Sequence, residues 1–245
     1  MHPFDFSLKH FGIWQGRTAM KVGTDAIALG AWTASLALPA THILDIGAGT
    51  GILSLMLAQT NEQAYIDAVE LEDGAYRDMC ANFEASPWSK RLHPIHADAL
   101  AYSAGDNYDL IISNPPFFLS TAPRAEGYSR QLARGEQLEG LGIASLVLRA
   151  RQLLSPQGAL CMICPSEREE DLRLSACEAG MYIEALCIVY SKASTPVRLM
   201  ALLRPLSGLM HYTPSRKDHL TLRDFSGKYS SEYKSLTSEF LLQTE

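Results

Sequence analysis

The sequence predicts an α/β fold in which a doubly wound, mostly parallel sheet of seven strands carries helices on both faces. Apolar runs short enough for strands alternate along the chain with stretches of helical spacing, the order typical of such sheets. A glycine-rich turn joins the first of these strands to the helix after it. With 245 residues, 47% of them hydrophobic, the chain can bury one large core.

The first helix and the first strand share an uncharged stretch from Ala26 to Leu44, with His42 taken as neutral. This stretch is long enough to span a bilayer. However, it contains Gly30, Pro39 and several hydroxyl side chains, and Asp45 follows at once. We therefore expect a buried helix, a turn at Pro39 and a strand, and no association with a membrane.

The other elements follow from the same patterns, with short connections between them. Strands are expected at Ile43–Ile46, Tyr65–Val69, Leu92–Ala97, Tyr108–Ile112, Gly158–Cys164, Met181–Tyr190 and Val197–Leu203. Helices are expected at Ile52–Ala58, from Asp73 to about Glu84, and at Leu138–Leu154. Asp73 could cap its helix, because a side-chain oxygen there can accept from free backbone N–H groups. The more polar part from about residue 205 is expected to pack on the sheet edge as an extension.

Composition limits the compartment and the partners. Five cysteines at irregular spacing exclude a disulfide framework and fit a reducing cytoplasm, and the N-terminus lacks the pattern of a secretory signal. Cys161 and Cys164 lie in an apolar strand without further ligands at zinc spacing, so we expect core residues and no metal site. The net charge is −6, but residues 1–24 carry +2 and residues 186–234 carry +5. Such local patches decide whether phosphate groups bind.

The glycine-rich turn is Asp45-Ile46-Gly47-Ala48-Gly49-Thr50-Gly51. Glycines allow a tight turn and the close approach of a ligand to the backbone. Glu70 follows Gly49 by 21 residues, at the end of the next strand, where a carboxylate can accept from the hydroxyls of a ribose. The third glycine falls one position too early for a dinucleotide fingerprint, so a nicotinamide enzyme fits less well.

A second motif, Asn114-Pro115-Pro116-Phe117, follows directly on the strand that begins at Tyr108. Consecutive prolines fix the backbone and remove two donors, which leaves a stiff turn with exposed carbonyl oxygens. The Asn114 side-chain oxygen and the Pro115 carbonyl could accept two hydrogen bonds from one planar NH2 group. Phe117 could stack on the ring that carries this group. We therefore expect Asn114, Pro115, Pro116 and Phe117 to form the catalytic corner.

Both motifs resemble those of known enzymes. Asp45, Gly47, Gly49 and Gly51 resemble the first motif of class I (Rossmann-like) methyltransferases that depend on S-adenosylmethionine. The resemblance implies that Glu70 and Leu71 hold the ribose end of this cofactor, and that Asp98 and Ala99 lie at its adenine. Asn-Pro-Pro-Phe resembles the signature of methyltransferases that act on exocyclic or amide nitrogens.

The segment Arg17–Trp32 narrows the family. Together with Ser86-Pro87-Trp88 and the tail Tyr229–Leu236, it resembles the bacterial methyltransferases that modify one adenine of valine tRNA beside the anticodon. The resemblance implies that residues 1–40 cover the substrate and cofactor, and that residues 41–245 form the methyltransferase domain. Within the covering segment, the cofactor contacts implied are Lys21, Gly23, Thr24 and Asp25. Asn114 of the catalytic corner is expected to contact the cofactor as well.

A tRNA partner needs cations for its phosphates. The candidates for RNA binding are Arg124, Arg130, Arg134, Arg198, Arg216 and Lys217. The first three lie in a long irregular stretch from Phe118 to Glu136, a length that in compact domains is often functional. The oligomeric state stays open between a monomer and a weak dimer.

Other functions stay possible from the residues alone. The Asn-Pro-Pro motif is shared by methyltransferases of rRNA guanine and of protein glutamine, although the Lys21–Asp25 segment argues against both. A non-catalytic RNA-binding factor on the same fold is a third possibility. The intact Asp45, Glu70, Asp98 and Asn114 argue against it.

Overall fold

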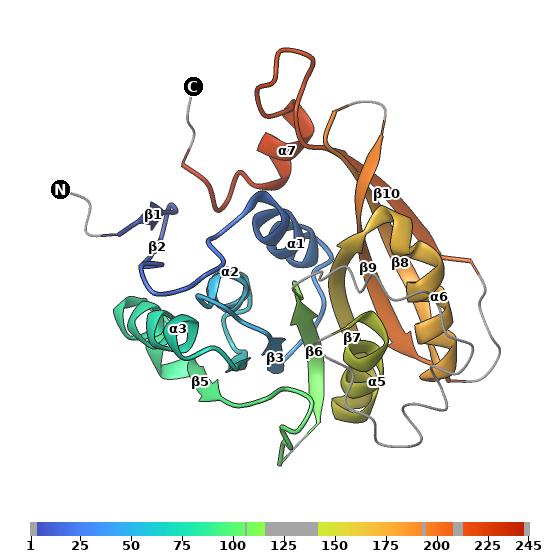
Figure 1. The fold of residues 1–245 in the computed structure, drawn as a ribbon, viewed down its shortest axis with the longest axis horizontal. Helices are drawn as coiled ribbons and strands as arrows, with labels where there is room; N and C mark the ends of the chain where they lie inside the picture. Colours follow the sequence, from blue (N-terminus) through green and yellow to red (C-terminus); the bar gives the residue numbers. More distant parts are fainter. Residues whose placement is uncertain (1–3, 106, 116–141, 193–194, 208–212, 243–245) are drawn as a thin grey trace.

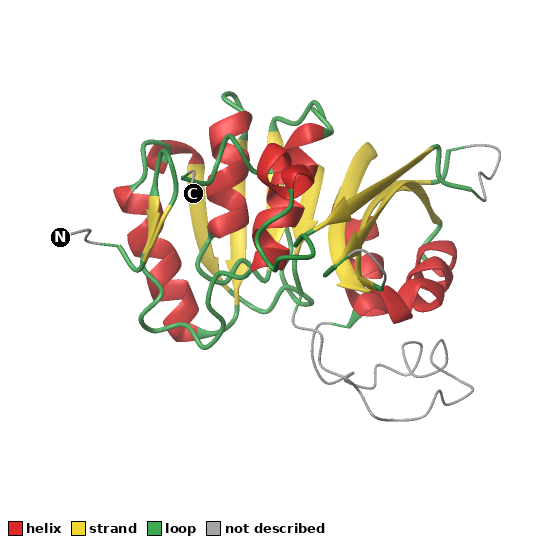
Figure 2. Ribbon diagram, turned by 90° about the horizontal axis from the view of Figure 1, so that it is seen from above, coloured by secondary structure: helices red, strands yellow, loops and turns green. Residues whose placement is uncertain are grey.

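The computed structural model describes residues 4–105, 107–115, 142–192, 195–207 and 213–242, and it confirms the α/β fold class (Figure 1). One large sheet runs through the molecule with helices on both faces (Figure 2). Its strands are β3 (His42–Ile46), β4 (Tyr65–Glu70), β5 (Leu92–His96), β6 (Tyr108–Ser113), β7 (Leu154–Pro165), β8 (Met181–Tyr190), β9 (Pro196–Pro205) and β10 (Arg216–Thr221). A two-stranded ribbon, β1 (Phe6–Ser7) with β2 (Gly12–Ile13), precedes them.

The strands lie in the order β10-β8-β9-β7-β6-β3-β4-β5. Only the pairs that β9 makes with β7 and β8 are antiparallel among these neighbours. From β3 the chain moves to β4 and β5 on one side, and then returns to place β6 on the other side of β3. The order therefore reverses between β3 and β6, and such a switch point opens a crevice at the carboxyl ends of the strands.

The sheet has eight strands where the sequence predicts seven. The additional strand is β10, which pairs parallel with β8 at the edge and belongs to the expected C-terminal extension. Its sequence, Arg216 to Thr221, contains two adjacent cations and little apolar alternation. Charged side chains are typical of an edge strand, which needs no apolar run to be stable there.

The helices form one layer on each face of the sheet. They are α1 (Thr24–Ser35), α2 (Ile52–Thr60), α3 (Asp73–Ala85), α5 (Ile143–Leu153), α6 (Glu169–Glu178) and α7 (Ser231–Leu236), with short helices η1 (Ser89–Arg91) and η2 (Ser166–Arg168). Leu29 of α1, Met56 of α2 and Phe83 of α3 share one buried cluster, and Leu146 of α5 and Leu172 of α6 share the other. None of the described helices has the length and apolar character needed to cross a bilayer.

Most element boundaries agree with the sequence. The uncharged stretch forms α1 and then β3, as expected. The cap of α3 is Glu72 and not Asp73, because the Glu72 carboxylate accepts from Gly74 N and Ala75 N. Asp73 lies in the first turn and pairs with Arg77. The helix expected from Leu138 begins at Ile143, and residues 138–141 lie outside the described part.

Candidate active site

The glycine turn leaves β3 with three backbone conformations that favour glycine. The φ angles of Gly47, Gly49 and Gly51 are 68°, 58° and 80°, in the left-handed region that side chains disfavour. A Cβ on Gly51 would lie 2.4 Å from a ring carbon of Phe83, whereas one on Gly49 would meet nothing within 4 Å. Gly51 is therefore needed for packing on α3, and Gly49 leaves the backbone open to a ligand.

Glu70, the last residue of β4, joins the glycine turn to the next connection. Its Oε2 accepts from Gly49 N at 2.7 Å, and its Oε1 accepts from Leu71 N at 2.9 Å and Glu72 N at 2.8 Å. A carboxylate offers about four acceptor positions. The half-buried Glu70 therefore keeps one position on Oε2 for a hydroxyl group beside the open Gly49.

Asp45 has a different role from Glu70, because it lies fully buried under the turn. Its Oδ2 accepts from Ser54 N at 3.1 Å and Ser54 Oγ at 2.7 Å, which fixes the first turns of α2. Its Oδ1 has no hydrogen-bond partner among the described residues. Burial raises the pKa of Asp45 to about 7. Direct contact of Asp45 with a cofactor stays a prediction, and the structure assigns its side chain to the support of the turn.

The connection after β5 brings Asp98 to the same edge of the sheet. Ala97 N donates to the Glu70 carbonyl at 3.1 Å, which ties this connection to β4. Asp98 is exposed, and its Oδ1 accepts from Leu100 N at 2.9 Å. Leu71 is 64% exposed. An exposed apolar side chain, and a carboxylate oxygen that accepts no hydrogen bond within the described ranges, lie beside Glu70 and suit a ring with an amino group.

Asn114 lies across the switch point from the glycine turn. The buried Ser113 donates from its Oγ to the Ile46 carbonyl at 2.8 Å, which holds the end of β6 against the end of β3. Asn114 follows at once and is half-buried, and Pro115 is buried. Pro116 and Phe117 of the same motif lie outside the described residues. The structure thus brings Asn114 and Gly47 to the two sides of the switch point.

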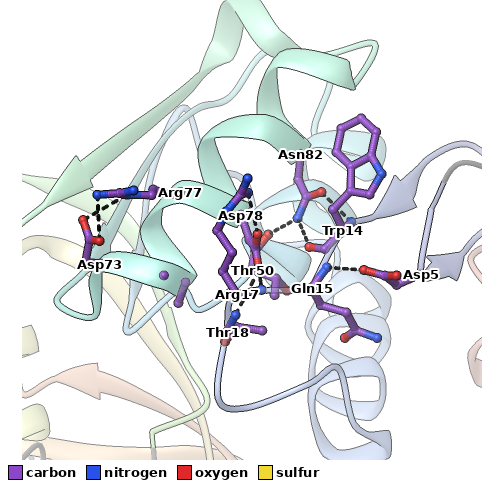
Figure 3. A network of polar contacts seen from close by, with 12 residues as sticks. Asp5, Trp14, Gln15, Arg17, Thr18, Thr50, Asp73, Arg77, Asp78 and Asn82 are labelled. Atoms are coloured by element: carbon purple, nitrogen blue, oxygen red, sulfur yellow. Dashed lines mark hydrogen bonds and ion pairs between the residues drawn. The ribbon is translucent and has the colours of Figure 1, made fainter.

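The N-terminal segment is fixed over α3 by two buried polar side chains, shown in Figure 3. Asp78 Oδ2 accepts from Arg17 N at 2.8 Å and Thr18 N at 3.0 Å, and its Oδ1 pairs with the Arg17 guanidinium at 3.1 Å. Asn82 accepts from Trp14 N at 2.7 Å and donates at 2.9 Å to the carbonyls of Trp14 and Thr50. Because Thr50 belongs to the glycine turn, residues 14–18 are held directly beside that turn.

The sequence interpretation missed Asp78 and Asn82, although a signal was present. Ala75, Asp78, Met79, Asn82 and Phe83 are buried at helical spacing, so two polar residues lie on the apolar face of α3. Polar side chains on such a face need partners, and here the N-terminal segment supplies them.

Asp25 and Arg198 form an ion pair between α1 and the start of β9. Their atoms Oδ2 and Nε lie 2.7 Å apart, and both side chains are about one-third exposed. The pair places the beginning of α1, with Gly23 and Thr24, at the carboxyl edge of the sheet. Lys21 is exposed just before it.

The predicted RNA contacts are only partly brought together. Arg198 lies at the carboxyl edge, opposite Pro165 at the end of β7. Arg216 and Lys217 begin β10, so they lie towards the other edge, and Arg216 pairs with Asp218 at 2.8 Å. Arg124, Arg130 and Arg134 lie outside the described residues. RNA binding by these six stays a prediction.

Cys161 and Cys164 are buried in β7, as expected of core residues.

The chemistry of these groups fits S-adenosylmethionine better than a dinucleotide. A pyrophosphate would need free backbone donors, but Gly49 N is already taken by Glu70. Three features are left to contact a ligand. They are one acceptor position of Glu70 for a ribose hydroxyl, the exposed Leu71 and Asp98, and the open space over Gly49.

Sequence comparisons identify relatives of the chain. The family described as "Methyltransferase small domain" matches residues 33–176. A tRNA1(Val) (adenine(37)-N6)-methyltransferase from Tolumonas auensis is 42% identical over 248 residues, which cover 99% of each chain. An enzyme of the same name from Porphyromonas gingivalis is 40% identical over 244 residues, covering 96% of this chain and 94% of its own.

Solved structures with low sequence identity share the fold. A predicted O-methyltransferase from Agrobacterium tumefaciens superposes with a TM-score of 0.65 at 16% identity, over 91% of this chain and 99% of its own. A putative class I methyltransferase from Listeria monocytogenes gives 0.62 at 15% identity, over 89% and 71%. A glycopeptide N-methyltransferase complexed with S-adenosylmethionine gives 0.56 at 11% identity, over 76% and 100%.

Proposed function

We propose that this chain, which belongs to the family of tRNA1(Val) (adenine(37)-N6)-methyltransferases, methylates the 6-amino group of adenine 37 in that tRNA. S-adenosylmethionine supplies an electrophilic methyl group on a sulfonium. Membership of the family makes the chain a methyltransferase. The proposal extends this to three further properties of the chain: its contacts with the cofactor, its tRNA substrate and its place of action in the cytoplasm.

The cofactor is held at the carboxyl ends of β3, β4 and β5. Glu70 accepts from a ribose hydroxyl through its remaining Oε2 position, and Asp98 accepts from the adenine amino group. Leu71 and Ala99 flank the adenine ring, and Gly47 and Gly49 let the methionine part approach the backbone. The segment with Lys21, Gly23, Thr24 and Asp25 closes over the methionine end, supported by the Asp78 and Asn82 contacts.

Asn114 prepares the nucleophile. The lone pair of an amino group on an aromatic ring is delocalised, so adenine N6 attacks poorly on its own. The Asn114 side-chain oxygen and the Pro115 carbonyl accept the two hydrogens of this group and favour a tetrahedral nitrogen. Phe117 stacks on the adenine ring. Correct placement in line with the methyl carbon and sulfur then supplies much of the rate enhancement.

The proton that N6 loses needs no strong base. Once methylated, the nitrogen carries a positive charge and is strongly acidic, so water or a neighbouring acceptor removes its proton. The target adenine must leave its stack to reach the corner, which requires roughly a few kcal/mol. Contacts to the flanking phosphates provide this energy.

The observation that carries the proposal is the position of Asn114 across the switch point from the glycine turn, held there by Ser113 and Ile46. The test is incubation of the purified chain with methyl-labelled S-adenosylmethionine and unmodified tRNA1(Val). We expect label in N6-methyladenosine, and none in a transcript whose adenine 37 is replaced by guanine. Label in guanine or in protein would support one of the alternative methyltransferases instead. A chain that does not bind the cofactor at all would be a non-catalytic factor.

A further inference from the structure

We infer that Phe225 is a stacking platform for an unpaired base of the tRNA, distinct from the target adenine, and this inference rests on the proposed function. Phe225 is 90% exposed, the most exposed of the described large apolar side chains. A single exposed apolar side chain is ordinary on a protein surface. Three further features of the structure set this one apart.

The first feature is the rigidity of the turn that presents the ring, Asp224–Lys228. Asp224 N donates to the Lys228 carbonyl at 2.9 Å, and Gly227 N donates to the Asp224 carbonyl at 3.1 Å. The Asp224 carboxylate accepts from Ser226 Oγ at 2.6 Å and Lys228 N at 3.1 Å. The hydrogen bond from the Ser226 hydroxyl is the main reason why the pKa of Asp224 is lowered. Because the backbone of this turn is already fixed, only the Phe225 side chain has to be ordered when a base stacks on it, which favours binding.

The base of the turn is fixed as well. Arg223 Nη1 donates to the Gly227 carbonyl at 2.7 Å, and the Arg223 guanidinium lies 4.6 Å from the centre of the Tyr229 ring. Tyr229 stacks in turn on Tyr233, with centroids 4.7 Å apart, and Tyr233 is buried in the core. The turn that carries the exposed ring is therefore anchored to the core through Arg223, Tyr229 and Tyr233.

The second feature is position. β10 ends at Thr221 opposite Tyr190, the last residue of β8, so the turn leaves the sheet at its carboxyl edge. Asn114 follows the carboxyl end of β6 at the same edge, four strands away. Four strand spacings separate the ends of β10 and β6 by about 19 Å, and a few nucleotides of an RNA loop can bridge a span of this order. In Figure 1 the turn is the red loop that projects beyond α7.

The third feature is charge. Lys192, Lys228 and Lys234 are exposed around the turn. Arg223 N donates to the Ser191 carbonyl at 3.2 Å, which brings Lys192 close to the turn. Two acids of this region, Asp224 and Glu232, accept from neutral donors and stay negatively charged. With Arg223, the described residues around the turn carry four cations and two acids, so the cations prevail. An aromatic ring among cations is the combination that binds single-stranded nucleic acid, by stacking on bases and attraction to phosphates.

The test compares Phe225→Ala, Phe225→Leu and Phe225→Trp with the unchanged chain, using unmodified tRNA1(Val). We expect Phe225→Ala and Phe225→Leu to raise the KM and the Kd for tRNA about tenfold, the effect of losing one base–aromatic stack. Phe225→Trp should keep both values. The kcat and the affinity for S-adenosylmethionine should change less than twofold in all three. Leu174→Ala, which alters a 56% exposed side chain on α6, should leave tRNA binding unchanged.

The other possible results of these measurements contradict either the stacking inference or the proposed function. If the unchanged chain methylates tRNA and Phe225→Ala binds it equally well, the stacking inference is wrong and the proposed function stands. If Phe225→Leu matches the unchanged chain, apolar area and not stacking is at work. If sedimentation shows that Phe225→Ala dissociates a dimer, the ring binds a second copy and not RNA. If the unchanged chain has no activity on tRNA, the proposed function itself fails.

Discussion

Glu70 joins three parts of the site through one carboxylate. It accepts from the glycine turn and from two consecutive residues after β4, and it keeps one position for a ligand. Glu70→Ala therefore removes the proposed cofactor contact and loosens the turn. Because hydrogen bonds to charged groups contribute about 1.5–3 kcal/mol each, we expect the Kd for S-adenosylmethionine to rise at least about tenfold. Calorimetric titration measures this.

Glu72→Ala provides the matched control for Glu70→Ala. Glu72 is an exposed acid two residues away that caps α3. Its loss should cost about 1 kcal/mol of stability and leave the Kd for the cofactor unchanged. Equal losses of affinity in the two variants would show that Glu70 acts only by holding the fold.

Asp45 makes stability depend on pH. Its pKa in the folded chain is about 7 and its ordinary value is 3.8, so between these values the folded state binds more protons than the unfolded state. Stability from this group therefore falls as pH rises through the window, by up to about 4 kcal/mol. Asp45→Asn should lack this decline when unfolding by urea is followed from pH 4 to pH 7. The same slope in both proteins would contradict the burial argument.

At the scale of elements, the buried side chains of Asp78 and Asn82 on α3 hold residues 14–18 in place. Asp78→Ala leaves two backbone N–H groups and a guanidinium without their acceptor, and loss of such partners costs about 1–3 kcal/mol. We expect trypsin to cleave after Arg17 and Lys21 at least about tenfold faster in this variant.

Asp73→Ala tests whether that effect is local. Asp73 also lies on α3, but its ion pair with Arg77 is exposed on both sides, and exposed pairs contribute little. Cleavage should then proceed as in the unchanged chain. If both variants are cleaved at the same rate, Asp78 does not hold the segment.

The elements that could be predicted from the sequence are those with an apolar pattern of their own. Strands such as Tyr108–Ile112 and the helix within the uncharged stretch could be located because they are buried. β10 could not, since an edge strand obtains its stability from pairing with β8 and needs few apolar residues. The capping by Glu72 depends on the local geometry of the chain before α3, which composition does not determine.

The residues of the candidate site also fall into those that could be predicted from the sequence and those that could not. Glu70, Asp98 and Asn114 could be predicted to lie together because each follows a strand whose carboxyl end meets the others at one edge. The partners of Asp78 and Asn82 lie more than 30 positions away in the chain. Such long-range contacts are recognised only when the fold is known.

At the scale of the whole molecule, the two ends of the chain hold each other. Lys9 N donates to the Phe240 carbonyl at 2.9 Å, and Lys9 Nζ donates to the Ser238 carbonyl at 2.5 Å. The Phe240 side chain is 2% exposed. Phe240→Ala should therefore destabilise the protein by about 3–5 kcal/mol, measured by its melting temperature. Leu242→Ala, at a half-exposed neighbour, should have little effect. Similar melting temperatures for both variants would contradict closure by the termini.

The central claim is that Asn114 activates the target amine while other residues hold the cofactor. The most direct measurement is single-turnover methyl transfer to tRNA1(Val) by Asn114→Ala, with the Kd for S-adenosylmethionine measured on the same preparation. We predict that transfer falls below detection while the Kd changes less than threefold. Transfer at the normal rate, or a loss of cofactor binding that accounts for the lost transfer, would contradict the account.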